Sequence, residues 1–157
     1  MKTNIRRIFI GGEMLKELLR GKIQIIEEVE DWEDAIHKSS LPLLENGSIE
    51  ATYVDAMIQM CKDYNAYIVL MDNFAMPHAS SDKGANKLDA TLTIVRKPVD
   101  FMGKPVQVIL PLSFIDNQSH LAMLQEVATL MGDESNLEQL VNAATIEEIE
   151  AIIEAQI

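Results

Sequence analysis

Hydrophobic and polar residues follow two different periods along the chain, and each period predicts a type of secondary structure. Residues 53–65 place apolar side chains at i, i+3, i+4 and i+7, the spacing of one face of a helix. Residues 89–97 alternate between the two faces of an extended chain, as a strand does. Residues 105–115 are nearly all apolar, which is typical of a strand covered on both faces. The chain therefore combines helices with buried strands.

Residues that begin or end helices mark several further elements. Residues 31–44 are expected to form a helix that Pro42 kinks or interrupts. A later helix is expected to stop at Gly132, because glycine commonly caps helix C-termini. Ser135 and Thr145 each stand three residues before a glutamate, and this capping-box pattern predicts the starts of two short C-terminal helices. These amphipathic helices can pack within one chain or between the chains of a homo-oligomer.

The order of the expected elements indicates the fold class. A helix is expected at 13–20 and strands at 22–26 and 66–71, so helices and strands alternate through most of the chain. Alternation of this kind predicts an α/β domain with a largely buried sheet and helices on its faces. At 157 residues the chain has the size of one ordinary domain.

Composition and charge narrow the class of protein. Hydrophobic residues make up 48% and charged residues 24%, which excludes a disordered chain. No apolar run has the length of a transmembrane helix and the N-terminal stretch lacks a secretory pattern, so we expect a cytoplasmic protein. The net charge of −12 disfavours nucleic acid and anionic membranes and suits a basic protein partner, although solubility alone also explains it.

Cys61 and two of the three histidines have simple interpretations. Cys61 lies on the apolar face of the 53–65 helix and is expected to be a buried thiol, with no second cysteine for a disulfide. His37 is expected on the surface of a helix. His120 stands where the next helix is expected to begin, with Asn117 or Ser119 as the N-cap, and a helix start suits an anion.

His78 is the candidate nucleophile. Pro77 has no N–H group and pushes Met76 toward an extended conformation, so the chain presents the imidazole at the exit of a strand-like segment. Ser80 and Ser81 follow with hydroxyl groups. A neutral imidazole can attack a phosphoryl group when one ring nitrogen is free and the other is held by an acceptor. On these residues alone, an ordinary loop histidine is the favoured interpretation and the nucleophile is the alternative.

Several other chemistries have little support. The chain has neither a G-x-x-x-x-G-K loop nor a G-x-G-x-x-G motif, so nothing indicates direct use of ATP or a dinucleotide. A metal site at His78, His120 and Asp116 is conceivable, but these residues are widely spaced and lack an H-E-x-x-H motif or a cysteine pair. The G-x-S-x-G elbow of a serine hydrolase is also missing. We therefore expect no cofactor and no metal.

The segment YIVLMDNFAMPHAS, residues 67–80, resembles the active-site segment of the enzyme IIA components of the bacterial sugar phosphotransferase system. The likeness lies in the mannitol and fructose superfamily, most closely its ascorbate-type branch, and extends to DWEDAI, TIVRKPVDF and the C-terminal residues 116–153. It implies a single domain with a mixed, mostly buried β-sheet sandwiched between helices in three layers. The expected domain covers 15–157, preceded by an N-terminal extension or lead-in at 1–14.

The resemblance also implies a function. His78 would accept a phosphoryl group from phospho-HPr and pass it to a cognate enzyme IIB of a membrane sugar permease, with His120 supporting the phosphoryl group. Asp116 matches an acidic residue that commonly precedes this second histidine, and Ser80 and Ser81 are the candidate phosphate donors. The alternative is a regulatory module of the same type, in which the phosphorylation state of His78 controls a partner protein.

Three places depart from the family pattern. Asn73 stands where a glycine is usual, which bears on the geometry of the turn before His78. Ser80 and Ser81 stand where an arginine or a glycine often follows, which bears on the identity of the phosphate donors. Pro42 also falls where relatives carry an uninterrupted helix.

Overall fold

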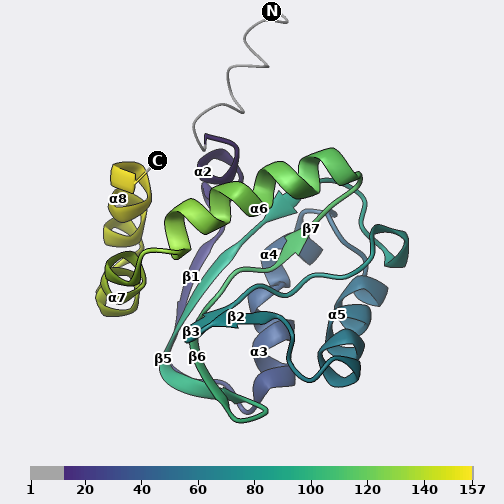
Figure 1. Cartoon of the computed structure of the whole chain (residues 1–157), viewed down its shortest axis with the longest axis horizontal. Coiled ribbons are helices and arrows are strands. Elements are labelled where there is room, and N and C mark those ends of the chain that lie inside the picture. The colour runs from purple at the N-terminus through teal and green to yellow at the C-terminus, as the bar shows by residue number, and fades with distance from the viewer. Residues whose placement is uncertain (1–12, 157) are drawn as a thin grey trace, which may run out of the picture.

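The computed structural model describes residues 13–156, which form three layers with a mixed β-sheet between two groups of helices (Figure 1). Residues 1–12, which make up most of the expected extension at 1–14, lie outside the described residues. The elements are, in chain order, α2 (Glu13–Leu19), β1 (Ile23–Ile26), α3 (Trp32–Ser39), α4 (Leu41–Glu45), α5 (Ala51–Asp63), β2 (Val69–Met71), β3 (Asn73–Ala75), the 3₁₀ turn η1 (Ser81–Lys83), β4 (Asp89–Ala90), β5 (Leu92–Phe101), β6 (Lys104–Ile109), β7 (Leu112–Ser113), α6 (Asn117–Met131), α7 (Glu134–Asn142) and α8 (Ile146–Gln156).

The sheet contains both parallel and antiparallel pairs, in the order β1-β5-β6-β3-β2. The β1–β5 and β3–β6 pairs are parallel, whereas β5–β6 and β2–β3 are antiparallel. The short strands β4 and β7 form a separate antiparallel pair. The expected α/β fold with a mixed sheet sandwiched by helices is therefore confirmed.

Two of the expected strands are each broken once. The strand expected at 89–97 is divided at Thr91 into β4 and β5, and the one expected at 105–115 is divided at Leu110 and Pro111 into β6 and β7. The two breaks face each other, because the Thr91 N–H donates to the Pro111 carbonyl across 3.2 Å. Proline has no N–H for a ladder, so the chain changes partners here and starts the β4–β7 pair.

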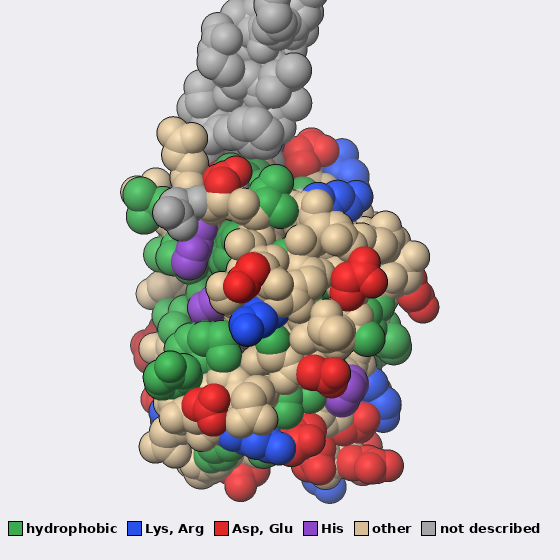
Figure 2. Space-filling view, turned by 90° about the vertical axis from the view of Figure 1, so that its right-hand side faces the viewer, with side chains coloured by type: hydrophobic (Ala, Val, Ile, Leu, Met, Phe, Trp, Pro, Cys, Tyr) green, Lys and Arg blue, Asp and Glu red, His purple; other side chains and the backbone are tan. Residues whose placement is uncertain are grey.

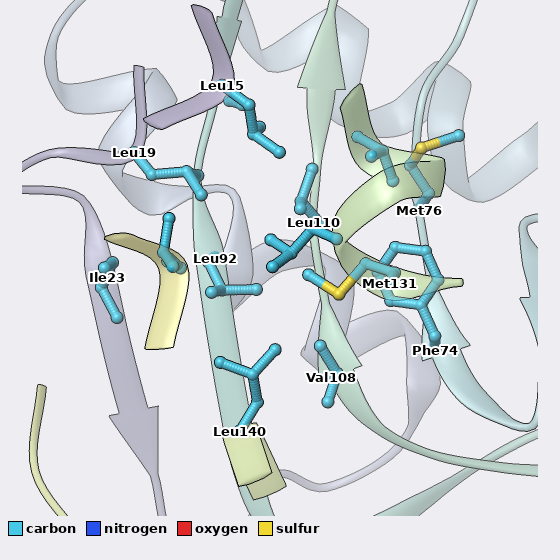
Figure 3. Close-up of a cluster of buried hydrophobic side chains, with 14 of the residues drawn as sticks. Leu15, Leu19, Ile23, Phe74, Met76, Leu92, Val108, Leu110, Met131 and Leu140 are labelled. Atoms are coloured by element: carbon cyan, nitrogen blue, oxygen red, sulfur yellow. The ribbon is translucent and has the colours of Figure 1, made fainter. Parts of the chain in front are cut away.

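Each face of the sheet has its own hydrophobic core. One core joins the sheet to α2, α6, α7 and α8, and Figure 3 shows Leu15, Phe74, Leu92 and Met131 converging in it. The other core joins the opposite face to α3, α4 and α5. Because α7 and α8 bury their apolar faces in the first core, these C-terminal helices pack within the chain.

The helix expected at 31–44 is interrupted, as predicted. It forms α3 and α4, which meet at Ser40, and Pro42 lies in the first turn of α4. The first N–H groups of a helix have no intrahelical partner, so a proline costs little there.

The structure corrects one predicted cap and confirms another. Helix α7 is capped by Asp133, whose carboxylate accepts from the Ser135 N–H at 2.8 Å, so Ser135 already lies inside the helix. Aspartate is as good an N-cap residue as serine, and Asp133 stands two residues earlier in the chain. At α8 the Thr145 hydroxyl accepts from the Glu148 N–H at 3.2 Å, as expected.

Candidate functional site

The turn that leads to the site is made by β2 and β3. The strand expected at 66–71 begins only at Val69, because Ala66 adopts a left-handed conformation with a φ of 61°. Asn73, the first residue of β3, has a φ of 72°. Glycine adopts such angles freely and asparagine tolerates them better than most residues. Asparagine is thus one of the few residues other than glycine that suit the backbone conformation of this turn.

The segment after β3 stays bonded to its neighbour as far as Pro77. The carbonyls of Ala75 and Pro77 accept from the N–H groups of Leu110 and Leu112, both at 2.9 Å. The chain therefore leaves the sheet directly at His78, whose position follows from main-chain bonds. This agrees with the prediction that the imidazole stands at the exit of a strand.

The imidazole of His78 is half-buried and has a defined tautomer. Its Nδ1 lies 2.7 Å from the carbonyl oxygen of Met76, and since that oxygen only accepts, Nδ1 carries the proton. In the neutral ring Nε2 then keeps its lone pair. Burial lowers the pKa of His78 below 6.5 and the nearby charge of His120 acts in the same direction, although the bond to Met76 opposes both. The ring is thus mainly neutral near pH 7.

His120 approaches from the other side on helix α6. The helix begins at Asn117, so neither Asn117 nor Ser119 is the N-cap, and the His120 N–H already donates to the Asp116 carbonyl at 3.2 Å. The ring of His120 stacks on Phe114, with centroids 4.1 Å apart and planes 19° from parallel. It stands 6.2 Å from the ring of His78, centroid to centroid.

These side chains line one open cleft of about 350 Å³. The five residues that the family resemblance assigned to the phosphoryl site all line this cleft, namely His78, Ser80, Ser81, Asp116 and His120. Figure 2 shows two histidine side chains close together among hydrophobic ones. The remaining lining residues are Tyr67 and Ala79, which belong to the segment 67–80 with the family resemblance, and Met60 and Phe114, which no sequence pattern marked.

The lining suits a phosphoryl group better than a metal ion. His120 and two serine hydroxyls can supply hydrogen-bond donors, His78 presents the lone pair of Nε2, and the aromatic rings of Tyr67 and Phe114 border them. Among residues 13–156, no group of three or more histidine, cysteine, aspartate or glutamate side chains is placed to hold a metal ion. His78, His120 and Asp116 share the cleft without forming such a group.

The other candidate residues lie where the sequence analysis expected them. His37 is exposed on α3 and does not line the cleft. Cys61 lies on the buried face of α5, and burial raises the pKa of its thiol to about 11. A thiol with so high a pKa is a poor nucleophile near neutral pH.

Known proteins share both the sequence and the fold. A family model described as "Phosphoenolpyruvate-dependent sugar phosphotransferase system, EIIA 2" matches residues 18–156. The chain belongs to this family. Its members are enzyme IIA components, which are phosphotransferase proteins, so the resemblance inferred from the sequence is confirmed.

Three related proteins illustrate the match. The mannitol-specific cryptic phosphotransferase enzyme IIA component of Escherichia coli (strain K12) is 32% identical over 133 residues, 83% of this chain and 90% of the relative. The ascorbate-specific PTS system EIIA component of Shigella boydii serotype 4 is 26% identical over 136 residues, 84% of this chain and 88% of the relative. The solution structure of the Escherichia coli mannitol-specific cryptic enzyme IIA has a TM-score of 0.84 at 30% identity, covering 90% of this chain and 98% of that one.

The helices of this enzyme IIA are short. Of those within residues 13–156, none has the length and apolar character needed to cross a membrane.

Proposed function

We propose that this enzyme IIA is a phosphoryl relay, in which His78 accepts a phosphoryl group from phospho-HPr and passes it to an enzyme IIB for coupled sugar uptake. One observation carries the proposal: Nδ1 of His78 is held by the Met76 carbonyl at 2.7 Å, in a cleft that also contains His120. A nucleophilic imidazole needs one ring nitrogen held and the other free to react. Family membership supplies the type of reaction.

In the proposed step, the Nε2 lone pair of His78 attacks the phosphorus atom. A new N–P bond forms while the bond to the phosphorylated group of HPr breaks, and the electron pair of that bond stays on HPr. The proton stays on Nδ1, which donates to the Met76 carbonyl throughout, so the step needs no proton transfer at the His78 ring. Transfer to enzyme IIB is the same displacement in reverse, with His78 as the leaving group.

The rest of the cleft stabilises the transferred group. The ring of His120 stands 6.2 Å from that of His78 between centroids and lines the same cleft, so His120 lies beside the place where a phosphoryl group on His78 would stand. The imidazole of His120 and the hydroxyls of Ser80 and Ser81 would donate to its oxygens. Donors that are already in place stabilise the charge of the transition state without reorganisation.

The proposed partner is consistent with one structural neighbour. The complex of mannitol enzyme IIA with phosphorylated enzyme IIB from Escherichia coli has the same fold, with a TM-score of 0.71 at 18% identity. In that structure the mannitol enzyme IIA is in complex with its phosphorylated enzyme IIB. We extend the same type of partner to this chain because the chain belongs to the family.

The test is incubation with phosphoenolpyruvate, enzyme I and HPr, followed by mass spectrometry. We expect an acid-labile phosphate on His78, no label on H78Q, and normal labelling of H37Q, which alters an exposed histidine outside the cleft. A wild-type protein that stays unlabelled while a known enzyme IIA is labelled would refute the proposal. Labelling without onward transfer to any enzyme IIB would favour the regulatory alternative.

A further inference from the structure

The peptide group that follows His78 is held at both of its polar ends by tyrosine hydroxyls. The hydroxyl of Tyr67 donates to the His78 carbonyl at 3.0 Å. The N–H of Ala79, at the other end of the same peptide bond, donates to the hydroxyl of Tyr53 at 3.0 Å. Because a peptide group is planar, two bonds of this kind fix its orientation and therefore the backbone next to the imidazole.

Tyr53 also connects this peptide to the other half of the site. Its side chain is fully buried on α5, and its hydroxyl lies 2.7 Å from the Leu112 carbonyl and 3.2 Å from the Ala79 carbonyl. The hydroxyl has one proton, and the shorter distance assigns it to Leu112. Strand β7 leads from Leu112 to Phe114, on which His120 stacks, so one hydroxyl joins the two chain segments that bring the histidines together.

Tyr67 contacts the imidazole as well as the backbone. Its ring lies edge-on to the ring of His78, with centroids 5.4 Å apart. The imidazole is thus restrained by the Met76 carbonyl at Nδ1, by the Tyr67 ring beside it, and by the fixed peptide at its own carbonyl. A side chain restrained at several points loses little conformational freedom when it reacts.

We propose that Tyr53 and Tyr67 are positioning residues for His78, which hold its imidazole in the orientation and tautomer needed for phosphoryl transfer. The inference rests on the proposed function and adds two residues that do not themselves react. Burial raises the pKa of each tyrosine to about 12, so both hydroxyls stay protonated and act as fixed hydrogen-bonding groups.

The chain provides a matched control for this proposal. Tyr64 lies close in the sequence and packs edge-on against Tyr67 with 5.9 Å between ring centroids, but 63% of its surface is exposed. The Y53F, Y67F and Y64F substitutions each delete one hydroxyl and nothing else. Only the first two deletions remove a hydrogen bond to the His78–Ala79 peptide group.

The experiment compares these variants and the Y53F/Y67F double variant in the HPr-dependent labelling assay and by ¹⁵N NMR of the imidazole. We expect labelling of His78 to slow about tenfold in Y53F and in Y67F, because a small misplacement of a reacting group is costly. The ¹⁵N signals of His78 should shift from one tautomer toward a mixture of two. Y64F should match the wild type in both measurements.

The outcomes separate this inference from the proposed function. If Y53F and Y67F melt at lower temperatures but keep the wild-type labelling rate and tautomer, the hydroxyls only stabilise the fold and the inference is wrong. If Y53F does not fold, Y67F at the rim of the cleft gives the same test. If the wild type is not labelled at all, the proposed function fails, and the tautomer measurement still decides whether the tyrosines orient His78.

Discussion

The rings of Phe114 and His120 stack almost in parallel, with centroids 4.1 Å apart and planes 19° from parallel. Phe114 follows β7 directly and His120 lies in the first turns of α6, so the stack fixes the helix start against the strand. Because Phe114 also contacts the ring of His78, one aromatic side chain sets the spacing of the two histidines. The position of α6 relative to β7 therefore determines how far the His120 ring lies from the His78 ring.

Replacing His120 with glutamine should therefore alter His78 in two ways. Loss of the His120 ring as a donor to the transferred group is expected to slow labelling of His78 by roughly 100-fold. The pKa of His78 should rise, because the charge of His120 lowers it in the wild type. An NMR titration of the His78 ring gives its pKa. A variant whose His78 titrates at the wild-type pH would contradict the coupling of the two rings.

The surface beside the cleft should contribute to partner binding. Ile115 and Leu121 flank the cleft residues Asp116 and His120, and they are 51% and 62% exposed. Placing a charge on such an apolar rim opposes the desolvation that protein association requires. L121D should raise the KM for phospho-HPr about tenfold, equivalent to about 1.4 kcal/mol, and leave the melting temperature unchanged.

The matched control for L121D is I146D. Ile146 is 38% exposed at the start of α8, away from the cleft, and an aspartate is well tolerated at a helix N-terminus. We expect I146D to keep the wild-type KM. Equal effects of the two substitutions would argue against a docking role for the Leu121 surface.

The left-handed conformation of Asn73 predicts an unusual order of stabilities. N73A should lower the free energy of unfolding by about 1 kcal/mol, because a Cβ is disfavoured at a φ of 72°. N73G should lose less, since glycine adopts this angle without steric cost. Urea denaturation of the two variants measures the difference. If N73A proves more stable than N73G, backbone strain at this turn is not the controlling factor.

A partly buried ion pair between Lys22 and Asp89 joins the residue before β1 to the start of β4. Asn46 and Ser48 also donate to the Asp89 carboxylate, at 2.9 and 2.5 Å, and the Asp89 side chain is 2% exposed. D89N leaves the ammonium of Lys22 without its counter-charge. We expect it to lower the free energy of unfolding by about 3 kcal/mol, measured in urea at pH 7. A loss below about 1 kcal/mol would show that the pair contributes little.

The Asp89 carboxylate should also make the free energy of unfolding depend on pH in the acid range. Burial alone would raise the pKa of Asp89, but the bonds from Lys22, Ser48 and Asn46 outweigh it and hold the pKa below 3.8. The native state therefore binds this proton less readily than the unfolded state. The contribution of Asp89 is complete above the unfolded pKa and is lost as the pH falls through the lower native value. D89N should lack this part of the acid dependence in urea denaturation between pH 5 and pH 2.

The sequence predicted the class of fold, and the residues that it marked as candidates for chemistry lie together in one cleft. Pro77 and His78 stand in a segment with a family pattern, and His120 stands near a helix start, so local signals marked both. Their proximity was not a local signal. It depends on the parallel pairing of β3 with β6, which brings the chain before His78 next to the chain that leads to His120.

Two residues, Tyr53 and Asp133, have roles that the sequence patterns did not predict. Tyr53 falls on the same buried face of α5 as Val54 and Met57, and helical periodicity does not distinguish a hydroxyl that bonds to the His78 loop from a ring that only fills the core. The cap at Asp133 was missed because Ser135 offered an equally good local pattern.

The acceptor that holds Nδ1 of His78 is a main-chain carbonyl, and this has a consequence for how the relay responds to its surroundings. A carboxylate in that place would titrate and draw the proton toward itself, whereas the Met76 oxygen has no ionisation of its own. Since the pKa of His78 is lowered, changes in acidity around neutrality leave the same nitrogen ready to react. The rate of phosphoryl transfer through the proposed relay would then depend on the phosphorylation levels of its donor and acceptor proteins. It would not depend on a titration within the enzyme IIA itself.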